Sequence, residues 1–277
     1  MDRLEPTITS LYSAGFGVIG QPNFTSNTGV TTQSGLLDST GVAINSAGNL
    51  YVSDGANSRV LIFNPPFSNG MNASVVIGQP NFTSNTPALT QSGLDTPYGV
   101  AIDSAGNLYV SDNVYSRVLI FNPPFSNGMN ASVVIGQPNF TSNTPALTQS
   151  GLDAPRGVAI DSAGNLYVSD GVNSRVLIFN PPFSNGMNAS VVIGQPNFTS
   201  NTPALTQSGL HTPYGVAIDS AGNLYVSDNV NNRVVMFHPP FSNGMNASDT
   251  NASTYSSIVY PGNRKVFYVP NSGISKI

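Results

Sequence analysis

The strongest candidates for catalytic residues in this sequence are four Asp–Arg pairs, in which the two residues are five positions apart. A carboxylate and a cation held across a turn could serve acid–base catalysis. An active site occurs once in a chain, however, whereas this pair recurs at the same place in every copy of a repeat. We therefore interpret the pairs as structural ties between two strands, in which each partner satisfies the charge of the other. They are Asp54/Arg59, Asp112/Arg117, Asp170/Arg175 and Asp228/Arg233.

Metal-binding residues are scarce. The only histidines are His211 and His238, and neither has another histidine or a glutamate near it in the sequence. A zinc site needs three or four converging ligands. The chain has no cysteine, and its only glutamate is Glu5. The DSAGN turns are too short for a calcium-binding EF-hand loop. We expect no catalytic residue, no metal and no cofactor.

The composition restricts the partners. The net charge is −4, and only 8% of the residues are charged. Nucleic acids need a basic face, which this balance does not supply. No apolar run reaches the length of a membrane span, and the first residues lack the apolar centre of a signal peptide. We expect no nucleic-acid binding and no membrane insertion. The charge-poor surface, rich in Asn, Ser and Thr, favours an extracellular or cell-surface location.

The chain repeats itself every 58 residues. Gly99–Arg156 and Gly157–Tyr214 differ at 5 of 58 positions. Each unit contains four short apolar runs separated by turn residues, followed by a long polar loop such as Asn139–Arg156. Such a sheet buries both faces only if neighbouring sheets stack on it, and a propeller achieves this radially. In the unit that starts at Gly99 the runs are Gly99–Asp103, Leu108–Asp112, Arg117–Asn122 and Ala131–Gln137.

These units resemble NHL repeats. The stretch GVAIDSAGNLYVSDNVYSRVLIF from Gly99 has the pattern of that family: a Gly-Val-Ala strand, a Gly-Asn turn, a Tyr-Val-Ser-Asp strand and Arg-Val opening the next strand. Near copies begin at Gly41, Gly157 and Gly215. The resemblance implies a β-propeller, most often with six blades. This chain departs from the family in its longer unit and in having too few units for six blades. It also lacks the histidines of the NHL-like amidating lyases and the Glu/Asp metal cluster of the related lactonases.

The unit count predicts one all-β domain over residues 1–277, a propeller of four-stranded antiparallel blades. Units begin at residues 41, 99, 157 and 215, and a degenerate fifth begins near 255. Residues 16–21 match the fourth-strand motif without a blade ahead of them. We expect a five-bladed ring in which this N-terminal strand completes the C-terminal blade, because an unpaired edge promotes aggregation. The alternative is an incomplete ring, or one that closes by oligomerisation.

Near-identical copies differ mainly in the link between the second and third strands and at the end of the long loop. In a blade whose first strand is innermost, both connections emerge on one face. Neutral drift in loops would give the same pattern, but the NPPFSNGMN and SAGN loops did not drift. Tyrosine and arginine are the residue types that anchor interfaces. The candidate partner-binding residues are Tyr98, Asn113, Tyr115, Arg156, Tyr214 and Asn231.

Asn-x-Ser/Thr sequons are copied with the repeat. All fall in or beside predicted loops, so a glycosylating secretory host could modify them, although composition alone explains many of them. Their asparagines are Asn23, Asn72, Asn81, Asn130, Asn139, Asn188, Asn197, Asn246 and Asn251.

The leading hypothesis is a non-enzymatic binding or scaffolding propeller that presents one loop face to a protein or glycan partner. A second is a propeller-type lyase or lactonase with a metal in its channel, which would need converging His, Glu and Asp side chains. A third is a structural repeat protein that forms fibres or surface assemblies through exposed edges or through the Pro-Pro-Phe loops. We expect a monomer, with self-assembly as the open alternative.

Overall fold

The computed structural model describes residues 17–248, and these residues form four antiparallel sheets, or blades. Blade 1 contains β1 (Ser39–Ile44), β2 (Leu50–Asp54), β3 (Arg59–Phe63) and β4 (Val75–Ile77). Blade 2 contains β5 (Pro97–Ile102), β6 (Leu108–Asp112), β7 (Arg117–Phe121) and β8 (Val133–Ile135). Blade 3 contains β9 (Pro155–Ile160), β10 (Leu166–Asp170), β11 (Arg175–Phe179) and β12 (Val191–Ile193). Blade 4 contains β13 (Pro213–Ile218), β14 (Leu224–Asp228) and β15 (Arg233–Phe237).

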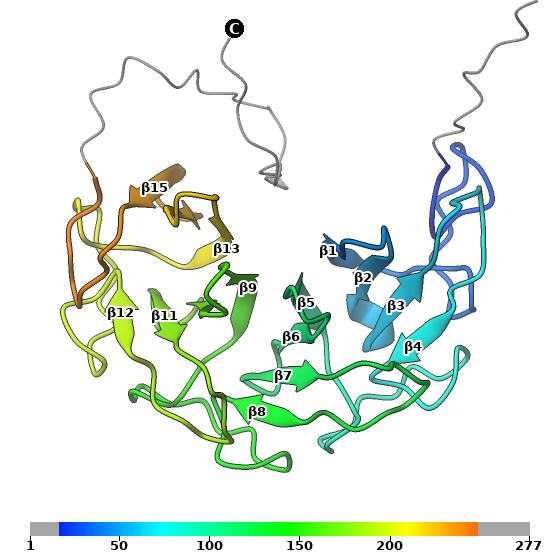
Figure 1. Cartoon of the computed structure of the whole chain (residues 1–277), viewed down its shortest axis with the longest axis horizontal. Helices are drawn as coiled ribbons and strands as arrows, with labels where there is room; N and C mark the ends of the chain where they lie inside the picture. The colour runs from blue at the N-terminus through cyan, green and yellow to red at the C-terminus, as the bar shows by residue number, and fades with distance from the viewer. Residues whose placement is uncertain (1–16, 249–277) are drawn as a thin grey trace, which may run out of the picture.

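The blades stand around a common centre as in a propeller (Figure 1). The first strands, β1, β5, β9 and β13, line the centre, and β4, β8 and β12 lie at the outer rim. Besides the strands, the described residues form one short 3-10 turn, Gly55–Asn57. None of their helices is long and apolar enough to cross a membrane. The all-β propeller of antiparallel blades that the sequence predicts is confirmed.

Local sequence explains the hairpins of each blade. In blade 2, the side chain of Asp103 accepts hydrogen bonds from the backbone N–H groups of Ala105 and Asn107 at 2.9 and 2.8 Å. Gly106 adopts a φ of 84°, which favours glycine. The turn delivers β6 into register with β7, where Leu108 faces Phe121 and Asp112 faces Arg117. The register places one Asp and one Arg opposite each other at the end of every hairpin.

Two strand boundaries differ from the sequence analysis. The inner strand of blade 2 begins at Pro97, not at Gly99, because Pro97 pairs with Asp112 before a bulge that ends at Val100. The outer strand is shorter than the predicted Ala131–Gln137 and covers only Val133–Ile135. Gly136, with a φ of 90°, turns the chain away from the ladder. The earlier start brings Pro97 and Tyr98 into the inner strand, which matters for the candidate site.

The core lies between blades. Tyr51, Val60 and Ile62 of blade 1 are buried in one cluster with Val100 and Leu108 of blade 2. Equivalent clusters fill the next two interfaces. Burial of such apolar side chains is the main stabilising contribution to the fold.

The loops with the sequence Pro-Pro-Phe belong to these interfaces. Phe125 of blade 2 meets Tyr51 of blade 1 edge to face, with ring centroids 5.9 Å apart. Phe183 and Phe241 make the same contact with the blade before each of them. Truncating these phenylalanines therefore removes contacts between blades, so such variants are unsuitable as neutral controls in a binding assay.

Inner strands of neighbouring blades approach so closely that only glycine fits at one position. A Cβ atom on Gly99 would lie 2.4 Å from the carbonyl oxygen of Arg156 in the next blade. Gly41 and Gly157 are equally crowded by the blades that follow them. A Cβ atom on Gly215 would instead meet Ser227 Oγ of its own blade, at 3.3 Å. The close approach of the next inner strand thus explains why the GVAI motif begins with glycine in blades 1, 2 and 3.

Both ends of the four-blade arc leave apolar side chains bare among the described residues. Val42 of β1 is 57% exposed, whereas its equivalent Val100 is 7% exposed. Val234 of β15 is 50% exposed, whereas its equivalent Val118 is fully buried. The fifth blade that the sequence predicts near residue 255 lies outside the described residues. Closure of the ring by that blade therefore stays a prediction.

The N-terminal segment does not form the strand expected at residues 16–21. Within residues 17–21 the structure has only an isolated bridge between Gly20 and Gly35. Its contacts nevertheless match those of an outer strand. The N–H of Val18 donates to the side chain of Asn69 at 2.8 Å, as Val76 of β4 does to Asn127 at 3.0 Å. The segment therefore lies against blade 1 as β4 lies against blade 2.

Candidate functional site

The Asp–Arg pairs hold strands and loops together. Arg117 Nε donates to Asp112 Oδ2 at 2.7 Å, and both side chains are fully buried. The other N–H groups of Arg117 donate to the carbonyl oxygens of Phe140 and Gly93, in the loops after and before the blade. The second oxygen of Asp112 accepts the backbone N–H of Asp95 at 2.7 Å. Both charged side chains are thus satisfied by partners within the blade and its loops.

Burial raises the pKa of these carboxyl groups, to about 7 for Asp112 and to about 6 for Asp170, although the arginine partners lower it. The two aspartates differ in one contact. Asn173 Nδ2 donates to Asp170 Oδ2 at 3.0 Å. In blade 2 the equivalent residue is Tyr115, whose ring lies 5.2 Å from the guanidinium carbon of Arg117. Asp112 therefore lacks an amide donor that would stabilise its charged form.

Replacing Tyr115 by Asn should restore that donor. The pKa of Asp112 lies above its ordinary value of 3.8, so the folded state holds a proton that the unfolded state releases, and stability falls as pH rises from about 4 to about 7. Tyr115→Asn lowers this pKa and should raise the free energy of unfolding by about 1 kcal/mol at pH 8. The gain should shrink at pH 5. Urea unfolding at both pH values measures it, and an equal change at both would contradict the assignment.

The two candidate asparagines donate their amide hydrogens within the protein. Asn231 Nδ2 donates to Asp228 Oδ2 at 2.8 Å and to the carbonyl oxygen of Ala204 at 3.1 Å. Asn113 Nδ2 donates to the carbonyl oxygen of Pro155, on the inner strand of the next blade, at 3.1 Å. Tyr115 lies on Arg117, as described above. The structure thus gives these three residues contacts inside the scaffold.

The other three candidates come together at the centre of the arc. Tyr98, Arg156 and Tyr214 each occupy the second position of an inner strand, in β5, β9 and β13. The guanidinium carbon of Arg156 lies 3.7 Å from the centroid of the Tyr214 ring. The Tyr98 ring meets the same Tyr214 ring edge to face, with centroids 6.4 Å apart. We call these three partly exposed side chains the channel cluster.

The channel cluster interrupts the repetition of the blades. In blade 1 the equivalent residue is Thr40, whose hydroxyl donates to the carbonyl oxygens of Pro97 and Tyr98 at 2.9 and 3.0 Å. Tyr98 and Tyr214 belong to blades 2 and 4, so their contact crosses blade 3 at the centre. In blade 2, the link between β6 and β7 contacts the residues just before β5, because the N–H of Val114 donates to the carbonyl oxygen of Asp95 at 3.4 Å.

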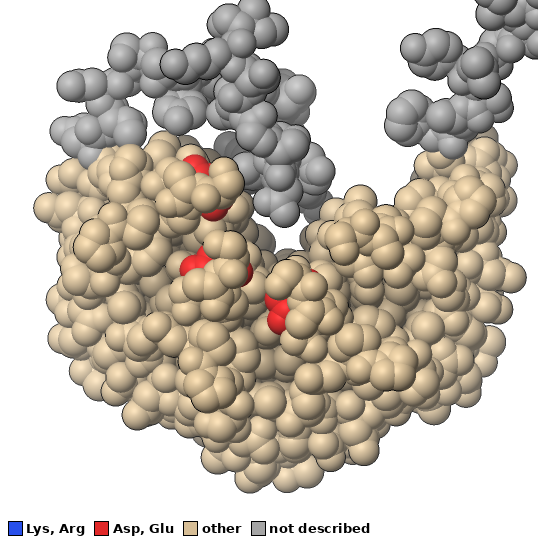
Figure 2. Space-filling model, viewed as in Figure 1, with Lys and Arg blue, Asp and Glu red and all other residues tan. Residues whose placement is uncertain are grey.

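Figure 2 shows one face of the molecule. Acidic atoms gather at three places beside the central hollow on this face, and no Lys or Arg is visible there. Four of the five arginines in the described part of the chain are held by buried aspartates. Most of the cationic side chains in the described part of the chain are therefore neutralised inside the scaffold.

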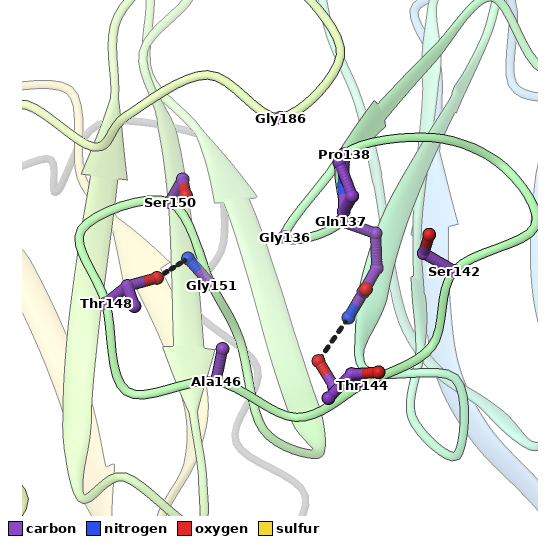
Figure 3. A pocket seen from close by; sticks show the side chains of 10 residues that line it. All are labelled: Gly136, Gln137, Pro138, Ser142, Thr144, Ala146, Thr148, Ser150, Gly151 and Gly186. Atoms are coloured by element: carbon purple, nitrogen blue, oxygen red, sulfur yellow. Dashed lines mark hydrogen bonds between the residues drawn. The ribbon is translucent and has the colours of Figure 1, made fainter.

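A pocket that the sequence analysis did not predict lies within the long loop (Figure 3). Its volume is about 330 Å³, and a similar pocket of about 220 Å³ lies in the preceding copy. Several of its polar groups bond to each other, as Gln137 Nε2 does to the carbonyl oxygen of Thr144 at 3.0 Å. The only hint in the sequence is the length of the loop. The pocket is lined by Gly136, Gln137, Pro138, Ser142, Thr144, Ala146, Thr148, Ser150, Gly151 and Gly186.

No cluster of three or more His, Asp or Glu side chains suited to a metal ion occurs within residues 17–248. The backbone N–H of His211 donates to Asp228 Oδ1 at 2.6 Å, as Asp95 and Asp153 do in their blades. His238 Nε2 lies 3.4 Å from the sulfur of Met236. The two histidines thus lie in different local settings.

The sequon asparagines in the described residues are all exposed, and Asn251 lies outside those residues. The side-chain oxygen of Asn139 accepts hydrogen bonds from the backbone and hydroxyl of Thr141, both at 3.0 Å. Exposure leaves these sites open to a modifying enzyme; whether they are modified stays a prediction.

The fold and the repeated blade place the chain among the β-propellers. The family model described as "NHL repeat" matches residues 40–63, 152–179 and 210–237. The chain therefore contains NHL repeats at these three places, and the resemblance seen in the sequence is confirmed.

Solved structures with a similar fold share 12% sequence identity with the chain. Virginiamycin B lyase from Staphylococcus aureus matches with a TM-score of 0.43, over 73% of this chain and 56% of that one. A streptogramin B lyase matches with a TM-score of 0.47, over 76% and 54%. Hydrazine synthase from Kuenenia stuttgartiensis matches with a TM-score of 0.48, over 77% and 49%. The chain thus spans about half the length of these proteins, and such distant similarities assign no activity to it.

Proposed function

We propose that this propeller is a non-enzymatic binding module whose protein or glycan partner docks on the channel cluster. The observation that carries the proposal is the convergence of Tyr98, Arg156 and Tyr214 at the one central position where the copies diverge. Aromatic and arginine side chains that are partly exposed and already stacked lose little entropy when a partner covers them. An extracellular or cell-surface location agrees with the exposed sequons and the low content of charged residues.

The proposal is tested by selecting binders of the immobilised full chain from a random peptide library and a glycan array. Replacing Tyr98, Arg156 and Tyr214 together by alanine should leave folding intact and abolish binding of the selected ligands. Truncating an interface anchor costs about 2 kcal/mol or more, so the dissociation constant should rise by at least tenfold.

A matched control replaces two exposed side chains outside the channel cluster. Phe24 is 71% exposed and Leu205 is 72% exposed. The double alanine variant at these positions should bind like the wild type. Ligands that tolerate the triple variant but not this control would move the binding site away from the cluster.

A further inference from the structure

Arg156 differs from the other four arginines that the structure describes. Those four are Arg59, Arg117, Arg175 and Arg233. Each of the four is paired with an aspartate at 2.7–2.8 Å. Asp153 lies three residues away in sequence, yet no ion pair joins it to Arg156, and burial alone raises its pKa. Arg156 is thus a cation at the centre of the propeller to which the described residues supply no carboxylate.

The guanidinium of Arg156 also has unused donors. Nε and Nη1 are buried and have no hydrogen-bond partner among the described residues. An unpaired buried donor usually indicates a missing partner, because leaving it unsatisfied costs about 1–3 kcal/mol. Stacking on Tyr214 occupies one face of the guanidinium plane and leaves the donors at its edge available. Carboxylate oxygens are strong acceptors for such guanidinium donors.

We propose that Arg156 anchors a carboxylate from the Asp or Glu side chain of a protein partner. This inference rests on the proposed function and names the chemistry of its central contact. The donors lie below the surface, although the residue itself is only partly buried. A carboxylate on a slender, flexible stem can reach them, whereas a uronic acid carries its carboxylate directly on a bulky ring. Tyr98 and Tyr214 would cover the stem of the acidic side chain.

Gly171 keeps the space beside the guanidinium open. It occupies the position held by Asn113 in blade 2 and Asn229 in blade 4. A Cβ atom at residue 171 would lie 3.3 Å from Arg156 Nε and 3.4 Å from Arg156 Cδ. Blade 1 also has a glycine at this link position, Gly55, but its inner strand carries Thr40 in place of an arginine. Gly171→Asn introduces the residue of the neighbouring blades and should crowd the donors without altering any charge.

The test follows the Nε–H signals of the ¹⁵N-labelled full chain by NMR at constant ionic strength. The probes are N-acetyl-glutamate α-amide and its uncharged counterpart, N-acetyl-glutamine α-amide. The signal that is missing from the spectrum of Arg156→Tyr identifies Arg156. This variant carries the residue found at the same position in blades 2 and 4, so it should fold. A single carboxylate probe is expected to bind in the millimolar range.

The glutamate probe should shift the Arg156 signal to saturation, and the glutamine probe should not. Gly171→Asn should weaken the response at least tenfold. An Arg156 signal that stays in place, or that shifts equally with both probes, overturns the inference. A third titration with glucuronate identifies the source of the carboxylate, since tighter binding of glucuronate would overturn the assignment to a protein partner. Equal shifts of the Tyr98 and Tyr214 signals with both amides would refute the carboxylate yet leave the binding face in place.

Discussion

Arg117→Ala is expected to lower the free energy of unfolding by about 3–5 kcal/mol. The substitution leaves Asp112 fully buried without its cation, and it also frees the carbonyl oxygens of Phe140 and Gly93. The loss should be visible as an earlier urea midpoint with an unchanged slope. Binding of a selected ligand by the remaining folded protein should not change, because the pair faces no partner.

The chain provides its own control for this prediction. Arg233 makes the same contact with Asp228 at 2.8 Å, but its side chain is 28% exposed. Water can solvate the partner left behind there, so Arg233→Ala should cost clearly less than Arg117→Ala. Equal losses at the two sites, or an unchanged midpoint for Arg117→Ala, would show that burial does not set the strength of these pairs.

Removing the segments expected to close the ring should convert the protein from a monomer into an associating species. The described blades end in bare apolar side chains, with Val42 57% and Val234 50% exposed. Burying an apolar side chain of this size fully is worth about 1.5–3 kcal/mol. Deletion of residues 1–22 or of residues 249–277 would leave such faces uncovered and expose strand edges, which promote aggregation.

Light scattering over a range of concentrations measures this association, and urea unfolding shows whether cooperativity is lost. Leu205→Ala in the full-length chain controls for the loss of exposed apolar surface elsewhere, because Leu205 lies in a loop. If the truncated chains remain monomeric and as stable as the full chain, the five-bladed closure is wrong.

The sequence predicted the blades well because each determinant is local. The DSAGN turn, the alternation of strands and turns, and the Asp and Arg opposite each other at the hairpin end all lie within one unit. The outer strand was predicted too long, because its end depends on the backbone conformation of Gly136. The strand expected at residues 16–21 is absent from the described residues 17–21, although Val18 keeps the outer-strand contact with Asn69.

The candidate site was predictable only in part. Divergence among copies pointed to Tyr98, Arg156 and Tyr214, but their contact depends on how closely the inner strands approach around the centre. The same divergence also selected Asn231, whose side-chain amide donates a hydrogen bond to Asp228. Variation among the copies does not separate residues that make structural contacts from residues that face a partner, because both kinds of residue vary in the same loops.

Oxidative footprinting with a selected ligand tests the binding face most directly. Tyrosine reports its own exposure to hydroxyl radicals, and the buried Tyr109 and Tyr167 serve as internal standards. Bound ligand should lower the oxidation rates of Tyr98 and Tyr214 several-fold and leave that of the exposed Phe24 unchanged. Protection of Phe24, with Tyr98 and Tyr214 still oxidised at the rates of the free protein, would contradict a binding site at the channel cluster.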